Sequence, residues 1–194
     1  MRLVLFGPPG AGKGTQATRI AAAWGVPHVS TGAMLRDAVS GGTALGTRVK
    51  DVMDRGLLVS DDLIGEVVEQ RLRQPDARRG FLLDGFPRTP RQVEILDRIL
   101  SGLGATLDRV VLLEVPERVV LQRLAGRAAA GDGGTVRADD NEDTIRERMR
   151  VYRAQTEPVA DIYRRRGILA EIDGTGTIDE VFAAVASELK GQRA

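Results

Sequence analysis

The chain has 194 residues, which suits one domain with small insertions, and 42% of them are hydrophobic, enough for a buried core. Its 28 Lys and Arg residues nearly balance its 27 Asp and Glu residues, and a net charge of +1 argues against a general nucleic-acid or membrane-surface binder. With no cysteine and one histidine, the sequence excludes disulfides and thiolate zinc sites and makes His-based metal clusters and Ser-His-Asp triads poor candidates.

The first predicted elements surround a glycine-rich segment, residues 7–15. The apolar residues 3–6 before it predict a strand, and a helix after it is predicted by the spacing of Ala17, Ile20, Ala21 and Trp24. Such a loop turns successive backbone N–H groups toward one point at the positive end of the helix dipole. Lys13 adds a full charge and is one of only three lysines in the chain. The segment therefore predicts a polyphosphate site.

The loop fits the P-loop pattern G-x-x-x-x-G-K-[ST] at Gly7, Gly12 and Lys13. Gly14 stands where Ser or Thr is expected, and Thr15 comes one position late, which displaces the hydroxyl that usually faces magnesium. A glycine-rich turn with a solvated lysine is the alternative interpretation, and the strand and helix on either side disfavour it.

Further apolar runs predict strands at residues 26–29, 81–83, 110–115 and 168–172, with helical patterns between them. Short buried strands that alternate with helices predict an α/β fold, here a three-layer P-loop fold with a five-stranded parallel sheet flanked by helices. Ligands of such sheets bind beyond the carboxyl ends of the strands. We therefore expect the glycine-rich loop and the segments 30–32 and 84–85 to converge on one crevice.

Two stretches interrupt the alternation. Residues 31–73 are helical in pattern, divided by Gly41-Gly42, and a further helix begins near Ser60, which we expect to cap it. Residues 128–138 contain Gly-Asp-Gly-Gly and are flexible by composition. This second stretch lies between two arginines, so it is either a plain surface loop or a mobile flap that carries arginines over a phosphate.

Two further helix starts have the form of a capping box. One is Thr89-Pro90-Arg91-Gln92, with Pro at the first helical position, and the other is Thr177-Ile178-Asp179-Glu180. The apolar positions that follow the second box predict a last helix that faces the core.

A second strong motif follows the third predicted strand, at residues 81–89. The strand ends in Asp84, which suits a carboxylate near magnesium, directly or through water. Arg88 follows a turn, and its guanidinium matches phosphate geometry. The alternative is an Asp that accepts turn hydrogen bonds beside a surface arginine, and the glycine-rich loop upstream disfavours it.

Residues 7–16, 30–36, 84–89 and 137–140 together resemble the adenylate kinases, in the right order and at compatible spacing along nearly the whole chain. The resemblance implies reversible, Mg²⁺-dependent phosphoryl transfer, ATP + AMP = 2 ADP, which maintains adenine nucleotide balance. It also implies that ATP, AMP and ADP are the ligands and that the protein is a monomer. Phosphoryl transfer needs charge stabilisation and in-line placement more than covalent catalysis, so a chain with no Cys can perform it.

The resemblance assigns site residues in three groups. The catalytic residues that it implies are Lys13, Arg88, Arg123, Arg127, Arg137 and Arg148, with Asp139 and Asp140 orienting the arginines. The ATP-binding residues are Gly10, Ala11, Gly12, Lys13, Gly14, Thr15, Arg123, Arg127, Gly174, Thr175 and Gly176. The AMP-binding residues are Thr31, Arg36, Leu57, Val59, Gly85, Arg88, Gln92, Arg137 and Arg148. Asp84 would organise hydrated magnesium. For Gln92 a purely structural capping role stands as the alternative, and we favour the role of reading the adenine edge of AMP.

The same resemblance divides the chain into a core (residues 1–29, 60–126 and 138–194), a helical AMP-binding insertion (30–59) and a short lid (127–137). Closure of both insertions would exclude water, which would otherwise accept the phosphoryl group. The lid has no room and no cysteine for zinc, so we expect no zinc. The sequence Gly-Lys-Gly-Thr in the loop is the family's own pattern.

Other functions are less well supported. A GTPase would carry an Asn-Lys-x-Asp motif, which is absent, and an ATP-driven motor would carry an acidic residue where Gly85 follows Asp84. A nucleotide-sensing module without turnover would have lost Lys13 or the arginines. Another nucleoside monophosphate kinase is the nearest rival, and Thr31 and Gln92 favour adenine.

The N-terminus has no long apolar signal segment and no run reaches about 18 apolar residues, so we expect a cytoplasmic protein with no membrane or nucleic-acid partner.

Overall fold

The computed structural model describes residues 1–129 and 142–191. Within these ranges no helix has the length and apolar character needed to span a membrane. The strands are β1 (Arg2–Phe6), β2 (His28–Ser30), β3 (Phe81–Asp84), β4 (Arg109–Glu114) and β5 (Leu169–Asp173). The helices are α1 (Lys13–Trp24), α2 (Thr31–Ser40), α3 (Ala44–Asp54), α4 (Asp61–Leu72), α5 (Pro90–Gly102), α6 (Glu117–Ala129), α7 (Glu142–Val151), α8 (Glu157–Arg165) and α9 (Ile178–Lys190), with a 3₁₀ turn at Pro75–Ala77 and a π-helical turn at Tyr152–Thr156.

The five strands form one parallel sheet in the order β2-β3-β1-β4-β5, as predicted. The predicted second strand began at residue 26, whereas β2 begins at His28. The reason is local: the N–H of Val26 is bonded to the carbonyl of Ala21 at the end of α1, and Pro27 has no N–H to give to a sheet. The other predicted strands agree with the structure to within one residue.

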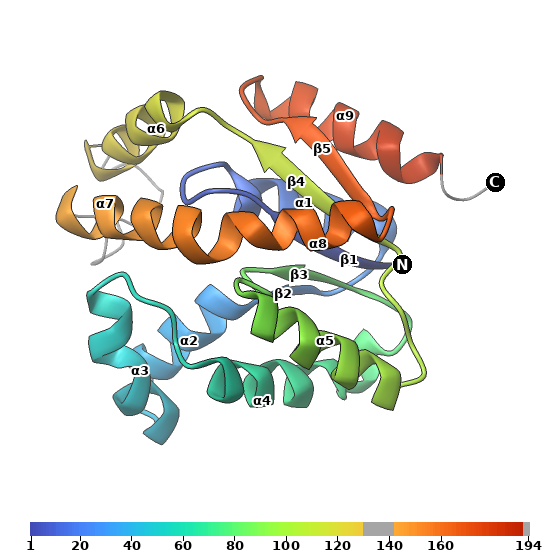
Figure 1. Ribbon diagram of the computed structural model, residues 1–194, viewed down its shortest axis with the longest axis horizontal. Coiled ribbons are helices and arrows are strands. Elements are labelled where there is room, and N and C mark those ends of the chain that lie inside the picture. Colours follow the sequence, from blue (N-terminus) through green and yellow to red (C-terminus); the bar gives the residue numbers. More distant parts are fainter. Residues whose placement is uncertain (130–141, 192–194) are drawn as a thin grey trace.

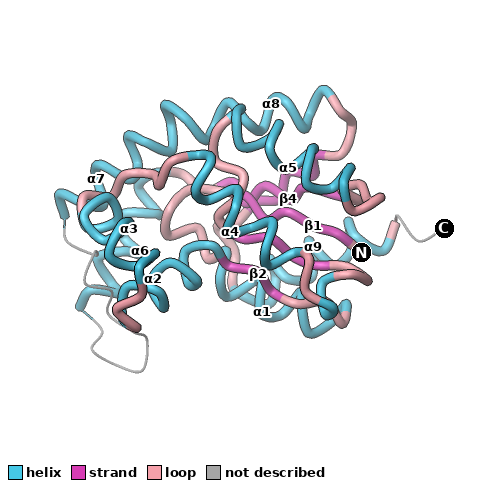
Figure 2. Tube along the Cα trace, turned by 90° about the horizontal axis from the view of Figure 1, so that it is seen from below, coloured by secondary structure: helices cyan, strands magenta, loops and turns pink. Residues whose placement is uncertain are grey.

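Helices cover both faces of the sheet and make three layers (Figures 1 and 2). Alternate strand residues point to opposite faces, so Leu3 and Leu5 pack with α1 and α9 while Val4 and Leu83 pack with the layer that contains α4, α5 and α8. In Figure 1, α8 crosses one face of the sheet and α1 lies behind it. The central strands β1, β3 and β4 are buried on both faces apart from their end residues, which is why they read as continuous apolar runs, whereas β5 at the edge of the sheet exposes Glu171 and Asp173.

The insertions gather at the carboxyl ends of the strands. Figures 1 and 2 show α2, α3, α6 and α7 at the end of the molecule opposite to the two termini. The predicted helical pair divided by Gly41-Gly42 is confirmed as α2 and α3. The predicted flexible stretch began at residue 128, but α6 continues through Ala129. The rest of that prediction, with Arg137, Asp139 and Asp140, lies outside the described residues.

The three predicted helix caps have different outcomes. The box at Thr177 and Glu180 is confirmed in both directions. At α5, Thr89 accepts from the N–H of Gln92, but the Gln92 side chain accepts from the N–H of Arg88 and not from that of Thr89, so only half of the box forms. Ser60 precedes α4 but makes no side-chain cap bond, so that prediction was wrong. Its neighbour Asp61 instead forms hydrogen bonds to α5, described below.

Candidate active site

The glycine-rich loop needs glycine for its backbone and for its packing. Gly10 and Gly12 have φ of +80° and +87°, in the left-handed region that side chains disfavour. A Cβ at Gly10 would lie 2.9 Å from Cγ of Leu124 in α6, and one at Gly7 would lie 2.7 Å from the carbonyl oxygen of Leu113. The loop is therefore held closely between β4 and α6, with the N-terminus of α1 behind it.

Lys13, the first residue of α1, is bent back over this loop. Its Nζ donates to the carbonyl oxygens of Gly7 and Pro8, each at 2.8 Å. These bonds hold the ammonium close to the backbone N–H groups at the start of the helix. A Cβ at Gly14 would have no neighbour within 4 Å, so this part of the helix start faces open space. A phosphate there would meet N–H groups and a full positive charge together.

Asp84 ends β3, the neighbour of β1, and pairs in register with Leu5 just before the loop. The residue is 9% exposed, and Nε2 of His28 lies 3.4 Å from its Oδ2. Burial acts to raise the pKa of the Asp84 carboxyl, but the His28 contact and the positive charges of Lys13 and Arg88 outweigh it, so the pKa lies below its ordinary value. The carboxylate is therefore kept ionised beside the loop.

The turn after β3 brings Thr31 and Arg88 together around Gly85. The Thr31 hydroxyl donates to the carbonyl of Asp84 at 3.3 Å, and Nε of Arg88 donates to the carbonyl of Gly85 at 2.8 Å. Gly85 has φ of +88°, and a Cβ there would lie 2.7 Å from the Thr31 hydroxyl and 3.0 Å from Nη2 of Arg88. In α2, the guanidinium of Arg36 folds back to the first turn, where a Cβ at Gly32 would lie 3.1 Å from its Nη1.

Gln92 lies in the first turn of α5 and is 2% exposed. Its Oε1 accepts from the backbone N–H of Arg88 at 2.7 Å, and its Nε2 donates to Oδ1 of Asp61 at 2.8 Å. The Thr89 hydroxyl donates to the same oxygen of Asp61 at 3.1 Å. Asp61 was not among the residues predicted for the site. Nothing in the sequence pattern links the start of α4 to the start of α5, because only the tertiary fold makes them neighbours.

Arg148 in α7 lies against the end of α3. A Cβ at Gly56 would meet Cγ2 and O of Thr144 at 3.1 Å and Cγ of Arg148 at 3.3 Å. The Thr144 hydroxyl also donates to the carbonyl of Asp54 at 3.4 Å. These contacts bring α7 next to the segment that contains Leu57 and Val59.

On the other side of the loop, α6 meets the turn after β5. Nη2 of Arg123 donates to the carbonyl of Thr175 at 3.2 Å. Asp173 shapes this turn by accepting from the N–H and the hydroxyl of Thr175, at 2.8 and 2.7 Å. The structure thus joins the predicted residues Arg123 and Thr175, and Arg127 continues the same helix.

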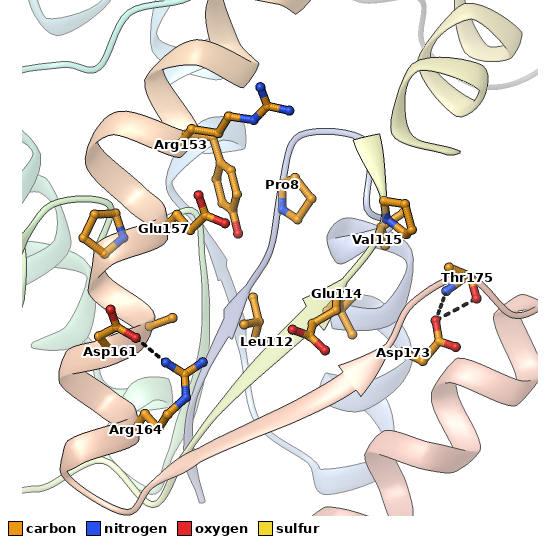
Figure 3. A pocket seen from close by; sticks show the side chains of 15 residues that line it. Pro8, Leu112, Glu114, Val115, Arg153, Glu157, Asp161, Arg164, Asp173 and Thr175 are labelled. Atoms are coloured by element: carbon orange, nitrogen blue, oxygen red, sulfur yellow. Dashed lines mark hydrogen bonds and ion pairs between the residues drawn. The ribbon is translucent and has the colours of Figure 1, made fainter. Parts of the chain in front are cut away.

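A cavity of about 940 Å³ lies beside the loop, between α8 and the ends of β4 and β5 (Figure 3). It shares Pro8 with the loop and Thr175 with the turn after β5. Four carboxylates line it, those of Glu114, Glu157, Asp161 and Asp173, and its two arginines, Arg153 and Arg164, are already paired with Glu117 and Asp161. Such an acidic lining is unfavourable for phosphates, which the basic groups around Lys13 and Arg88 suit better.

A parallel sheet with a glycine-rich loop after β1 and a carboxylate at the end of neighbouring β3 defines a P-loop nucleotide-binding protein. The family model of adenylate kinase matches residues 5–168. The chain is 50% identical to the adenylate kinase of Thermobifida fusca (strain YX), with 99% of this chain and 100% of that protein covered. It is 48% identical to that of Stenotrophomonas maltophilia (strain R551-3), with 98% and 100% covered, and 45% identical to that of Kosmotoga olearia, with 98% and 99% covered.

The chain belongs to the adenylate kinase family. It is therefore a phosphotransferase that transfers the terminal phosphoryl group of ATP to AMP and yields two ADP, as the resemblance of the motifs indicated.

Proposed function

We propose that the residues around the glycine-rich loop, Asp84 and Arg88 are the site of this transfer, with ATP on the loop side and AMP on the side of α2 and α3. The observation that carries the proposal is geometric: Asp84 ends the strand beside the one that leads into the Lys13 loop, and Arg88 bonds to the carbonyl of Gly85 directly after Asp84. Both positive charges act on this buried carboxylate. Lys13 belongs to the loop, and Arg88 belongs to the turn that borders α2. One carboxylate is thus acted on by the basic group of the proposed donor side and by that of the proposed acceptor side.

The donor half would hold the phosphates of ATP on the backbone of residues 10–15 and on Lys13. The contact between Arg123 and Thr175 supports a base site at the junction of α6 and the turn at residues 174–176. Gly174 packs closely on the end of β4, since its N–H is bonded to the carbonyl of Glu114 and a Cβ would lie 2.6 Å from Val115. The backbone of this turn would contact the adenine.

The acceptor half would hold AMP between the turn at Gly85 and α2. Thr31, Arg36 and Arg88 supply a hydroxyl and two guanidinium groups, which match a monophosphate. The backbone at Leu57 and Val59 would line the base site, and Gln92 would read the edge of the adenine.

Between the halves, arginines would stabilise the charge on the oxygens of the transferring group. Arg127, Arg137 and Arg148 are the proposed residues, with Asp139 and Asp140 orienting them, while Arg123 would lie beside the adenine of ATP. The contact of Arg148 with Gly56 supports its position on the acceptor side. The reaction needs no protein nucleophile, because AMP itself supplies the attacking phosphate oxygen.

Adenylate kinases use Mg²⁺. When bound with ATP, the ion neutralises charge on the phosphates. The residues present fit it: Asp84 offers a carboxylate with a lowered pKa at the end of β3, beside the phosphate loop. We propose that Asp84 holds the hydrated ion through water.

We also propose the division into a core, an AMP-binding insertion at residues 30–59 and a short lid at residues 127–137. In support, α2 and α3 form a separate helical pair, and α6 packs on α7 through its own apolar cluster of Val120, Leu124, Ile145 and Met149. The absence of zinc, the monomeric state and the cytoplasmic location stay proposals.

The test of the site is Lys13→Met, measured as the rate of ADP formation from ATP and AMP. We expect the turnover number to fall at least about 100-fold, the scale of losing one charge-stabilising group. Lys50→Met is the matched control, because Lys50 is exposed and pairs with Asp54 on α3, and it should keep the normal rate. A normal rate in Lys13→Met would refute the role of Lys13.

A further inference from the structure

The amide of Gln92 is bound at both ends by groups that each have only one hydrogen-bonding role. Its oxygen faces the backbone N–H of Arg88, which can only donate. Its nitrogen faces a carboxylate oxygen of Asp61, and a carboxylate can only accept. The orientation of the amide is therefore unambiguous.

Turning the amide over would break both contacts at once. The oxygen of Gln92 would then face the carboxylate of Asp61, and its NH₂ would face the N–H of Arg88. Two unmatched pairs inside a residue that is 2% exposed are costly, since water cannot easily satisfy them. The Thr89 hydroxyl, which also donates to Asp61, holds the carboxylate at the start of α5.

The fixed amide has a definite capacity left for a ligand. By its bonding capacity, the oxygen can accept one further hydrogen bond and the NH₂ can donate one more. That pair of groups complements a 6-aminopurine, which presents an amino donor next to a ring nitrogen acceptor. A 6-oxopurine presents an oxygen acceptor next to a ring N–H, the reverse order. A freely turning amide would accept either base, but this one would accept only the first.

We propose that Asp61 is a positioning residue that sets the base specificity of the acceptor site by holding the Gln92 amide in the orientation that accepts adenine and rejects 6-oxopurines. The inference rests on the proposed function, in which Gln92 reads the base of AMP. Asp61 acts through Gln92 and need not touch the nucleotide.

The experiment compares AMP with IMP as acceptors, because the two bases differ at the 6-position and the adjacent ring nitrogen that the amide would read. The variant is Asp61→Asn, whose side chain has nearly the same shape but can accept or donate. In this variant, Gln92 in its original orientation keeps its bonds to the N–H of Arg88 and to residue 61. In the reversed orientation, the Gln92 oxygen can accept from the new asparagine, so only the contact with the N–H of Arg88 is lost. We expect kcat/KM for IMP to rise, and the preference for AMP over IMP to fall at least about tenfold, within the range for one bidentate base contact.

Asp62→Asn is the matched control. Asp62 is exposed, carries the same charge and lies in the same first turn of α4. The control should keep the preference of the unaltered protein, and KM for ATP should be unchanged in both variants. If Asp61→Asn does not fold, Asp61→Ser provides the same comparison with a hydroxyl that can donate or accept. A gain with IMP supports the proposal, because general damage to the site cannot create activity.

Gln92→Met separates this inference from the proposed function. If it abolishes the preference for AMP while Asp61→Asn leaves that preference intact, Gln92 reads the base without help from Asp61, and the inference about Asp61 is overturned. If neither variant changes the preference, Gln92 does not read the base, and both the inference and that part of the proposed function fail.

Discussion

Arg88 is held at its position by the turn that ends β3. Its Nε donates to the carbonyl of Gly85, and its backbone N–H donates to Gln92. The side chain thus belongs to the acceptor half of the site, although its charge also acts on Asp84. A residue held in this way should discriminate between the two nucleotides when it is removed.

We expect Arg88→Ala to raise KM for AMP at least about tenfold, because a hydrogen bond to a charged group contributes about 1.5–3 kcal/mol. KM for ATP should change much less. Steady-state kinetics with each nucleotide varied in turn would measure both values. Arg91→Ala serves as the control, since Arg91 is exposed and pairs with Glu94. An equal increase for ATP and AMP would contradict the placement of Arg88 on the acceptor side.

The sequence predicted those site residues that lie close to one another along the chain. Lys13 follows its glycines directly, and Asp84 and Arg88 lie in one turn, so their proximity follows from the spacing. Asp61 could not be predicted in this way. Its two partners at the start of α5, Thr89 and Gln92, lie 28 and 31 positions further along the chain, and only the packing of α4 on α5 brings them to Asp61.

At the scale of the helices, the predictions depended on the same distinction. The capping box of α9 formed because Thr177 and Glu180 bond to each other's backbone N–H, and their side chains also bond to each other. The box of α5 formed by half, because the N–H of Arg88 takes the Gln92 oxygen that the N–H of Thr89 would need, while the Gln92 nitrogen bonds to Asp61. The local pattern thus failed through a neighbouring backbone N–H, and the bond to Asp61 adds a tertiary contact to the same side chain within the candidate site.

The pair α2 and α3 is closely packed at one glycine. A Cβ at Gly46 would lie 2.0 Å from the carbonyl oxygen and 2.4 Å from the carbonyl carbon of Ala38. Because these are backbone atoms, Gly46→Ala must separate the two helices, and we expect it to lower the free energy of unfolding by about 1–3 kcal/mol. Chemical denaturation would measure this loss.

Gly102→Ala is the control for that prediction. Gly102 is also helical, at the end of α5, and a Cβ there would meet no atom within 4 Å. Since alanine favours helices over glycine by up to about 1 kcal/mol, this variant should be neutral or slightly more stable. If the two variants had the same stability, the close approach of α2 and α3 would not be limiting.

At the scale of the whole molecule, the periodicity of the sequence determined most of the architecture. Strands that are buried on both faces of a parallel sheet alternate with helices along the chain. Because the carboxyl ends of parallel strands lie at one edge of the sheet, the motifs that follow these strands come together there. The extent of α6 was not predictable in the same way, because Gly131-Asp132-Gly133-Gly134 resembles a loop while the apolar cluster of α6 and α7 supports a longer helix.

The charge pattern of the folded molecule predicts how its stability depends on pH. Folding lowers the pKa of several carboxyls: Asp76, Asp84, Glu147, Asp173 and Glu180. The unfolded chain therefore binds protons at these groups before the folded chain does. Their stabilisation is fully present above the ordinary pKa values, about 4, and is lost as the pH falls through the lower folded values.

Asp84 should account for the largest single part of this loss, because it is the buried member of the group, whereas exposed ion pairs such as Asp76 with Arg71 contribute little. We expect Tm of the unaltered protein to fall steeply below about pH 4. The Tm of Asp84→Asn should be lower at pH 7 but should fall less on acidification, because asparagine does not titrate. Thermal denaturation between about pH 7 and pH 2.5 would measure both curves, with Asp76→Asn as the control expected to follow the unaltered protein closely. Parallel curves for the unaltered protein and Asp84→Asn would mean that the Asp84 carboxylate does not contribute to acid sensitivity.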